Sequence, residues 1–192
     1  MITEIEFIKD WRCFKKGITF SFRAGVNLLV GDQGTGKSSI FQVISDAAKP
    51  KSRLKVAKLK ATRGPVQSFD FENDNPRKKE FAGASNEAFQ DRLYSRFVSH
   101  GQVNLKIIKC LQELMDKEPI VIVMDEPDMA LSIRSINLLV EIIKKLASKG
   151  HQIIVSAHNK QLIDSFEDVL SLEHGKWMNS GDFVADQLKI KG

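Results

Sequence analysis

Short apolar stretches separated by polar turns run along the whole chain. Residues 2–8 and 18–22 alternate between apolar and polar side chains, which is typical of strands with one buried face. Residues 26–30 and 119–124 are short and almost wholly apolar, as strands buried on both faces are. The same patterns predict further strands at residues 66–71, 152–156, 169–172 and 176–178, the last two forming a hairpin.

Other segments repeat apolar residues at helical spacing. Helices are expected at 37–48, which ends before Pro50, and at 132–148, which Gly150 terminates. Residues 102–116 carry apolar side chains on one helical face. The remaining expectations are a basic strand or hairpin arm over 53–60, a loop over 72–85, and helices over 86–97 and 159–166.

Strands that alternate with helices predict an α/β fold with a mostly parallel core sheet flanked by helices. The alternation is least regular near the N-terminus and around residues 50–70, so we expect an antiparallel part there. The length of 192 residues fits a single domain over residues 1–192.

Composition narrows the class of protein. The hydrophobic fraction of 42% and the charged fraction of 28% are those of a globular domain that can bury a core. Cys13 and Cys110 belong to no CxxC pair, which favours reduced thiols in a cytoplasmic protein. We read no signal peptide, and no apolar run is long enough to cross a bilayer. A membrane role would therefore require a partner protein, which the sequence leaves unknown.

The net charge of +5 is unevenly distributed. Residues 49–63 contain no acid and seven cations, namely Lys49, Lys51, Arg53, Lys55, Lys58, Lys60 and Arg63. This basic segment is interpreted either as a solvated face or as a contact surface for the phosphate backbone of a nucleic acid.

Residues 31–38 match the pattern GxxxxGK[ST], the Walker A loop, with the expected strand before and helix after. Glycines let backbone N–H groups turn toward phosphates, Lys37 supplies a positive charge, and the Ser38 hydroxyl can bind Mg²⁺. The sequence thus predicts an ATP site made of Gly31, Asp32, Gln33, Gly34, Thr35, Gly36, Lys37, Ser38 and Ser39.

Two acids end the apolar strand 119–124. Asp125 is expected to hold Mg²⁺, and Glu126 to polarise the water that attacks the terminal phosphate. An acid at the end of a buried strand is costly without a function or a partner, so this Walker B pattern favours an ATPase.

These motifs, in this order, resemble the nucleotide-binding domain of the ABC ATPase superfamily. Residues 98–102 resemble its signature motif, with His100 in place of a glycine; residues 128–132 fall where its D-loop lies, and 156–158 resemble its switch-histidine motif. The resemblance implies a P-loop fold and an ATP-dependent homodimer. In that dimer Ser99 and Gly101 would contact the γ-phosphate held by the partner, and His158 would sense the γ-phosphate in its own site.

Two family elements stay open. The Q-loop residue could be Gln67, Glu72 or Asn73. The aromatic side chain that stacks on adenine could be Trp11 or Phe14, or both could be core residues. The lead-in to Walker A is similar to that of SMC and RecF-like ATPases. The rest resembles small stand-alone ATPases of bacteria and phages, which favours a role in nucleic-acid transactions or phage-related processes. The alternatives are an ABC transporter subunit and an ATP-dependent switch or toxin–antitoxin partner.

Overall fold

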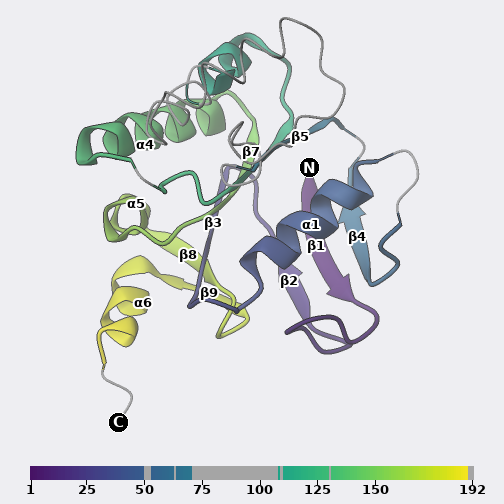
Figure 1. Ribbon diagram of the computed structural model, residues 1–192. Helices are drawn as coiled ribbons and strands as arrows, with labels where there is room; N and C mark the ends of the chain where they lie inside the picture. The colour runs from purple at the N-terminus through teal and green to yellow at the C-terminus, as the bar shows by residue number, and fades with distance from the viewer. Residues whose placement is uncertain (50–52, 63, 71–107, 109, 130, 190–192) are drawn as a thin grey trace, which may run out of the picture.

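Two β-sheets lie against each other in the computed structural model, and helices cover the larger sheet (Figure 1). The structure describes residues 1–49, 53–62, 64–70, 108, 110–129 and 131–189. The smaller sheet has the order β2-β1-β4 and is antiparallel throughout. Its strands are β1 (Ile2–Phe7), β2 (Thr19–Ser21) and β4 (Ala57–Ala61). The antiparallel part expected near the N-terminus is therefore confirmed.

The larger sheet has six strands in the order β5-β6-β7-β3-β8-β9. All neighbours in it are parallel except β8 and β9, which form the expected antiparallel hairpin. The strands are β3 (Val26–Val30), β5 (Val66–Asp70), β6 (Val121–Asp125), β7 (Gln152–Ser156), β8 (Asp168–Ser171) and β9 (Lys176–Asn179). Because the five parallel strands end at one edge, the loops that follow them meet there.

Each face of the large sheet belongs to a different hydrophobic core. Val121 and Val123 of β6 pack with the smaller sheet and with α1 (Lys37–Ala47). The alternating Ile122 and Met124 pack on the opposite face. That face is covered by α4 (Ile133–Ser148), α5 (Lys160–Asp164) and α6 (Ser180–Gln187), as Figure 1 shows. A strand buried on both faces must be apolar at successive positions, which explains the run at 120–124.

The side chain of Gln152 joins the two sheets. Its Nε2 donates to the carbonyls of Ile2 at 2.7 Å and Arg23 at 2.9 Å, and its Oε1 accepts the Ile2 N–H at 2.7 Å. Gln152 is almost fully buried, and the three bonds give a partner to both of its polar side-chain atoms, Nε2 and Oε1. The smaller sheet is thereby attached to the beginning of β7.

Most predicted elements are found within a few residues of their expected bounds. The basic strand begins later than expected, at Ala57 rather than at residue 53. Helix α6 was not predicted; Asn179 caps it by accepting the N–H of Gly181 at 2.9 Å. The expected loop over 72–85 and helix over 86–97 lie outside the described residues. Of the amphipathic segment 102–116, the structure describes helical backbone at 108 and 110–113 and the short 3₁₀ turn η1 (Leu114–Asp116).

Candidate nucleotide-binding site

The loop between β3 and α1 requires glycine at its last position. Gly36 is the N-cap of α1 and has a φ of 100°, a left-handed conformation that side chains disfavour. A Cβ atom at Gly36 would lie 2.3 Å from Cζ of Phe14 and 2.6 Å from Sγ of Cys13. The loop therefore packs directly on the segment that joins β1 to β2, and only glycine fits.

The start of α1 is arranged to receive an anion. Among the described residues, no side chain caps this helix and its first turn holds no acid. The first N–H groups of a helix have no partner within the helix, and the helix dipole adds a positive field there. Thr35 steadies the loop before the helix, because its Oγ1 donates to the Asp32 carbonyl at 2.9 Å. This end of α1 fits the phosphates of a nucleotide.

Lys37 points into the loop. Its Nζ donates to the carbonyls of Gly31 at 2.5 Å and Asp32 at 3.0 Å. Burial lowers the pKa of Lys37, while the nearby carboxylates of Glu126 and Asp125 oppose that shift. A buried ammonium group that donates to backbone carbonyls at the mouth of a helix fits a site that binds an anionic ligand.

The two Walker B acids are positioned through Ser156, the last residue of β7. Its hydroxyl donates to Oδ1 of Asp125 at 2.8 Å and accepts the backbone N–H of Glu126 at 2.7 Å. Glu126 has a φ of 50°, which is uncommon for a residue with a side chain. Ser156 thus holds the strained turn at the end of β6 from the neighbouring strand.

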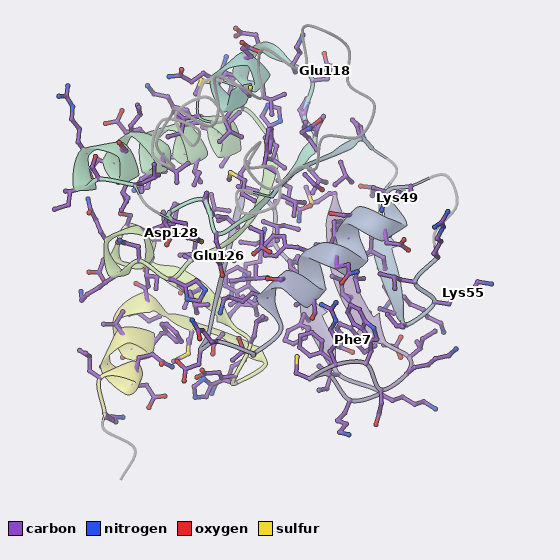
Figure 2. All side chains as sticks on the ribbon, in the orientation of Figure 1. Phe7, Lys49, Lys55, Glu118, Glu126 and Asp128 are labelled. Atoms are coloured by element: carbon purple, nitrogen blue, oxygen red, sulfur yellow. The ribbon has the colours of Figure 1, made fainter. Side chains whose placement is uncertain are left out.

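His158 is brought to Glu126 by Asp128. One oxygen of Asp128, Oδ2, accepts the N–H groups of His158 at 2.9 Å and Asn159 at 2.6 Å. Nε2 of His158 then lies 2.9 Å from Oε1 of Glu126. Figure 2 shows Glu126 and Asp128 on the turn that follows β6. The sequence placed these residues in separate motifs; the fold brings them into one hydrogen-bonded group.

A cavity of about 470 Å³ opens beside this group, between α1 and strands β5 and β6. Ser38, Asp125 and Glu126 line it together, as a site for a nucleotide with Mg²⁺ requires. Arg12, which the sequence analysis missed, also lines it and donates to the hydroxyl of Ser39 at 3.1 Å. The signal was present, because Arg12 lies between the two aromatic candidates Trp11 and Phe14.

The structure decides part of what the sequence left open. Phe14 is buried, with its ring 4.3 Å from that of Phe7, so it is a core aromatic rather than a ring open to stack on adenine. Trp11 is half-buried and stays a candidate, although Arg12 covers its ring at 4.7 Å. Gln67 pairs with Ile122, three residues before the Walker B acid, so it does not end its strand as a Q-loop residue should.

Some predicted residues cannot be placed. Ser99 and Gly101 of the signature motif, and Glu72 and Asn73, the two other Q-loop candidates, lie outside the described residues. Of the basic segment, residues 50–52 and 63 also lie outside them.

The described part of the basic segment has acids close by. Lys60 and Lys58 on β4 stand opposite Glu4 and Glu6 on β1. Nζ of Lys60 lies 2.6 Å from Oε1 of Glu4, and this contact raises the pKa of Lys60. The absence of acids within residues 49–63 therefore does not mean that the folded surface lacks them.

Comparison with known proteins agrees with this geometry. The family model described as the AAA domain matches residues 7–166. A Pyrococcus abyssi protein, named as an ABC transporter ATP-binding protein, is 27% identical over 87% of this chain and 76% of its own length. A solved ATP-binding subunit of an ABC transporter superposes with a TM-score of 0.64 at 16% identity, covering 97% of this chain and 93% of its own.

A second solved structure is the ATP-binding cassette MJ0796, a dimer in a post-hydrolysis state bound to ADP and Pi. It superposes with a TM-score of 0.59 at 16% identity, over 94% of this chain and 99% of its own. Both structures share the fold of this chain. Within the described residues, no helix is long and apolar enough to span a membrane. The chain belongs to the AAA domain family and is a P-loop ATPase of the ABC type.

Proposed function

We propose that this chain is an ATP-driven homodimer in which each protomer completes the other's ATP site. The observation that carries the proposal is the grouping of Lys37, Ser38, Asp125, Glu126 and His158 at one edge of the sheet. This group faces outward, since the side chain of His158 is 39% exposed and that of Glu126 is 26% exposed. A second protomer can therefore cover it.

Each residue has a distinct role in the proposal. Lys37 neutralises the terminal phosphates, and the hydroxyl of Ser38 and the carboxylate of Asp125 hold Mg²⁺. Glu126 accepts a proton from the attacking water, and His158 orients Glu126 and reports the γ-phosphate. Asp128 holds the backbone of His158 in place for this purpose. The remaining loop residues, from Gly31 to Ser39, supply backbone N–H groups.

Dimerisation is supported by two considerations. The signature residues Ser99 and Gly101 require a phosphate, and in the ABC superfamily that phosphate belongs to the opposite protomer. The similar cassette MJ0796 is dimeric in the state bound to ADP and Pi. Closure of the dimer over ATP would also exclude water from the phosphoryl group on which negative charge develops. The electrostatic interactions in the site would thereby become stronger.

Light scattering after size-exclusion chromatography tests the dimer. The Glu126→Gln variant should be dimeric with ATP and Mg²⁺ and monomeric without them, because the amide cannot accept the proton and ATP persists. Adding Ser99→Arg should leave it monomeric while calorimetry still detects ATP binding. Ser148→Arg, at the far end of α4, is the matched control and should leave the dimer intact. A Ser99→Arg protein that dimerises with ATP removes Ser99 from the interface.

A second candidate concerns the partner that uses the ATPase. The Pyrococcus abyssi relative is named for transport, so we propose the cytoplasmic energising subunit of a membrane transporter as the first alternative. Purification from gently solubilised membranes should then recover a transmembrane protein with the chain. The nucleic-acid or phage-related role keeps only the basic segment 49–63 as support, and Glu4 opposite Lys60 weakens that support.

The other alternative is an ATP-dependent switch or toxin–antitoxin partner. A protein of that kind would show a low turnover number for ATP as the pure dimer.

A further inference from the structure

Glu173, in the turn between β8 and β9, contacts the phosphate-binding loop from a distant part of the chain. Its Oε1 accepts the backbone N–H of Asp32 at 2.7 Å. Its other oxygen, Oε2, accepts from Nε2 of Gln187 at 2.9 Å, near the end of α6. One carboxylate therefore joins the loop to a helix that no predicted motif includes.

The peptide group that Glu173 contacts is also the one that Lys37 contacts. The carbonyl of Gly31 and the N–H of Asp32 belong to the same planar trans peptide, so they point in opposite directions. Lys37 donates to the carbonyl edge at 2.5 Å, and Glu173 accepts from the N–H edge at 2.7 Å. The two side chains hold this peptide from both sides.

This peptide needs such support because the residue before it is glycine. Gly31 has a φ of 148° and lacks a Cβ, so local steric clashes fix the orientation of the following peptide only weakly. In the proposed function, Lys37 leaves the Gly31 carbonyl to bind phosphate. Among the described side chains, Glu173 then remains on the peptide between Gly31 and Asp32.

We propose that Glu173 is a positioning residue that fixes the orientation of this peptide for ATP, and that α6 steadies Glu173 through Gln187. A second contact supports the link to α6: Nε2 of His174 lies 3.6 Å from Oδ2 of Asp186. The turn and α6 are thus connected at two successive residues on each side. The inference rests on the proposal that residues 31–38 hold the phosphates.

The test compares Glu173→Ala with Glu173→Gln. The alanine variant should raise the Kd and KM for ATP at least about tenfold, the equivalent of one hydrogen bond to a charged group. Its kcat should change less than about twofold, because Glu126 and His158 are untouched. The glutamine variant keeps an acceptor for the Asp32 N–H, so its Kd should stay within about threefold of wild type. Glu167→Ala removes an exposed glutamate just before β8 and should change nothing.

Hydrogen exchange supplies a readout that a general loss of stability would not imitate. The Asp32 amide should exchange at least about tenfold faster in Glu173→Ala at unchanged global stability, since it loses its acceptor. Gln187→Ala should raise the Kd for ATP by a smaller factor in the same direction. An alanine variant with the wild-type Kd, or alanine and glutamine variants with equal losses, would overturn the proposal.

Lys37→Ala in the same assays separates this inference from the proposed function. If Lys37→Ala binds ATP as wild type does, the phosphate assignment itself fails. If it loses ATP binding while Glu173→Ala keeps it, only the role of Glu173 fails.

Discussion

The nucleotide edge, made of residues 31–38, 125–128 and 156–158, differs sharply from the basic sheet face, made of Lys58 and Lys60 on β4 with Glu4 and Glu6 opposite. Both regions attract attention in the sequence, one through motifs and the other through charge. At the nucleotide edge, charged groups are held by precise hydrogen bonds, as Asp125 is by Ser156. On the basic sheet face, the lysines are exposed and meet acids from β1.

The difference teaches how far each kind of signal can be used. A contiguous motif such as the P-loop predicts its site reliably, because all of its residues lie on one loop and their spacing determines the geometry of that loop. A run of cations alone does not give the local charge, since a strand more than 50 residues away places two acids opposite Lys58 and Lys60. In Figure 2, Lys49 and Lys55 of the basic segment also lie well away from Glu126, so these two lysines can be altered apart from the nucleotide edge.

The largest effect is expected from Glu126→Gln at the nucleotide edge. Loss of a general base lowers kcat by about 100-fold or more, while calorimetry should find ATP binding unchanged. Lys37→Ala should instead lose ATP binding, because it removes the counter-charge of the phosphates. If Glu126→Gln releases phosphate at the wild-type rate, the catalytic role of Glu126 is wrong and the contrast with the basic sheet face disappears.

A pair of glycine variants measures how closely the nucleotide edge packs on the smaller sheet. Gly36→Ala and Gly34→Ala both place a side chain at positive φ, with values of 100° and 83°. Only the Gly36 variant meets other atoms, Phe14 and Cys13, since nothing lies within 4 Å of a Cβ at Gly34. Chemical denaturation should show Gly36→Ala less stable than Gly34→Ala by about 2 kcal/mol. Equal losses would mean that the loop can move away from Phe14 freely.

Lys37→Met should stabilise the protein without nucleotide while abolishing ATP binding. Burial lowers the pKa of Lys37 below its ordinary 10.5, so the unfolded chain binds the proton more tightly than the folded one. Wild-type stability should therefore rise with pH as the pH approaches 10.5. Relative to wild type, Lys37→Met should be more stable at pH 7, and this gain in stability should shrink toward pH 10.5. If the stability gained by Lys37→Met does not vary with pH, the gain comes from packing of the methionine side chain and not from removal of the buried charge.

The smallest effects are expected on the basic sheet face. Lys58→Glu with Lys60→Glu places like charges opposite Glu6 and Glu4, so the free energy of unfolding should fall slightly. ATP hydrolysis should stay within about twofold of wild type, since neither lysine lines the cavity. Gel shifts with duplex DNA at two salt concentrations accompany this variant. Binding that the variant loses, with a flatter salt dependence, would restore a nucleic-acid role for the segment.

Sequence reasoning succeeded where local patterns decide the structure. Strand β3 and the run at 120–124 are apolar at successive positions because both of their faces are buried, and the P-loop pattern is contiguous. It failed where distant residues decide. Nothing near Phe14 in the sequence indicates that Gly36 lies on it, and Glu173 shows no motif that would connect it with Asp32.

Helix α6 was missed for a related reason. It has eight residues and begins Ser-Gly-Asp, which are poor helix formers, so propensity argues against it. Its buried Phe183 belongs to the hydrophobic core on this face of the sheet, and α6 contacts α5, β8 and β9, which stabilises the helix. Cap residue Asn179 and the apolar pair at 183 and 184 were the only local signals.

The order of strands in the large sheet has a consequence for synthesis on the ribosome. Strand β3, which leads into the P-loop, pairs only with β7 and β8 among the described strands. Its partners lie about 120 residues or more downstream, at Gln152–Ser156 and Asp168–Ser171. Such non-local pairings fold slowly and leave strand edges exposed in the meantime. Residues up to Ser171 must therefore emerge before β3 is paired on both sides, and a ribosome stalled before β7 would carry a chain with an open β3 edge.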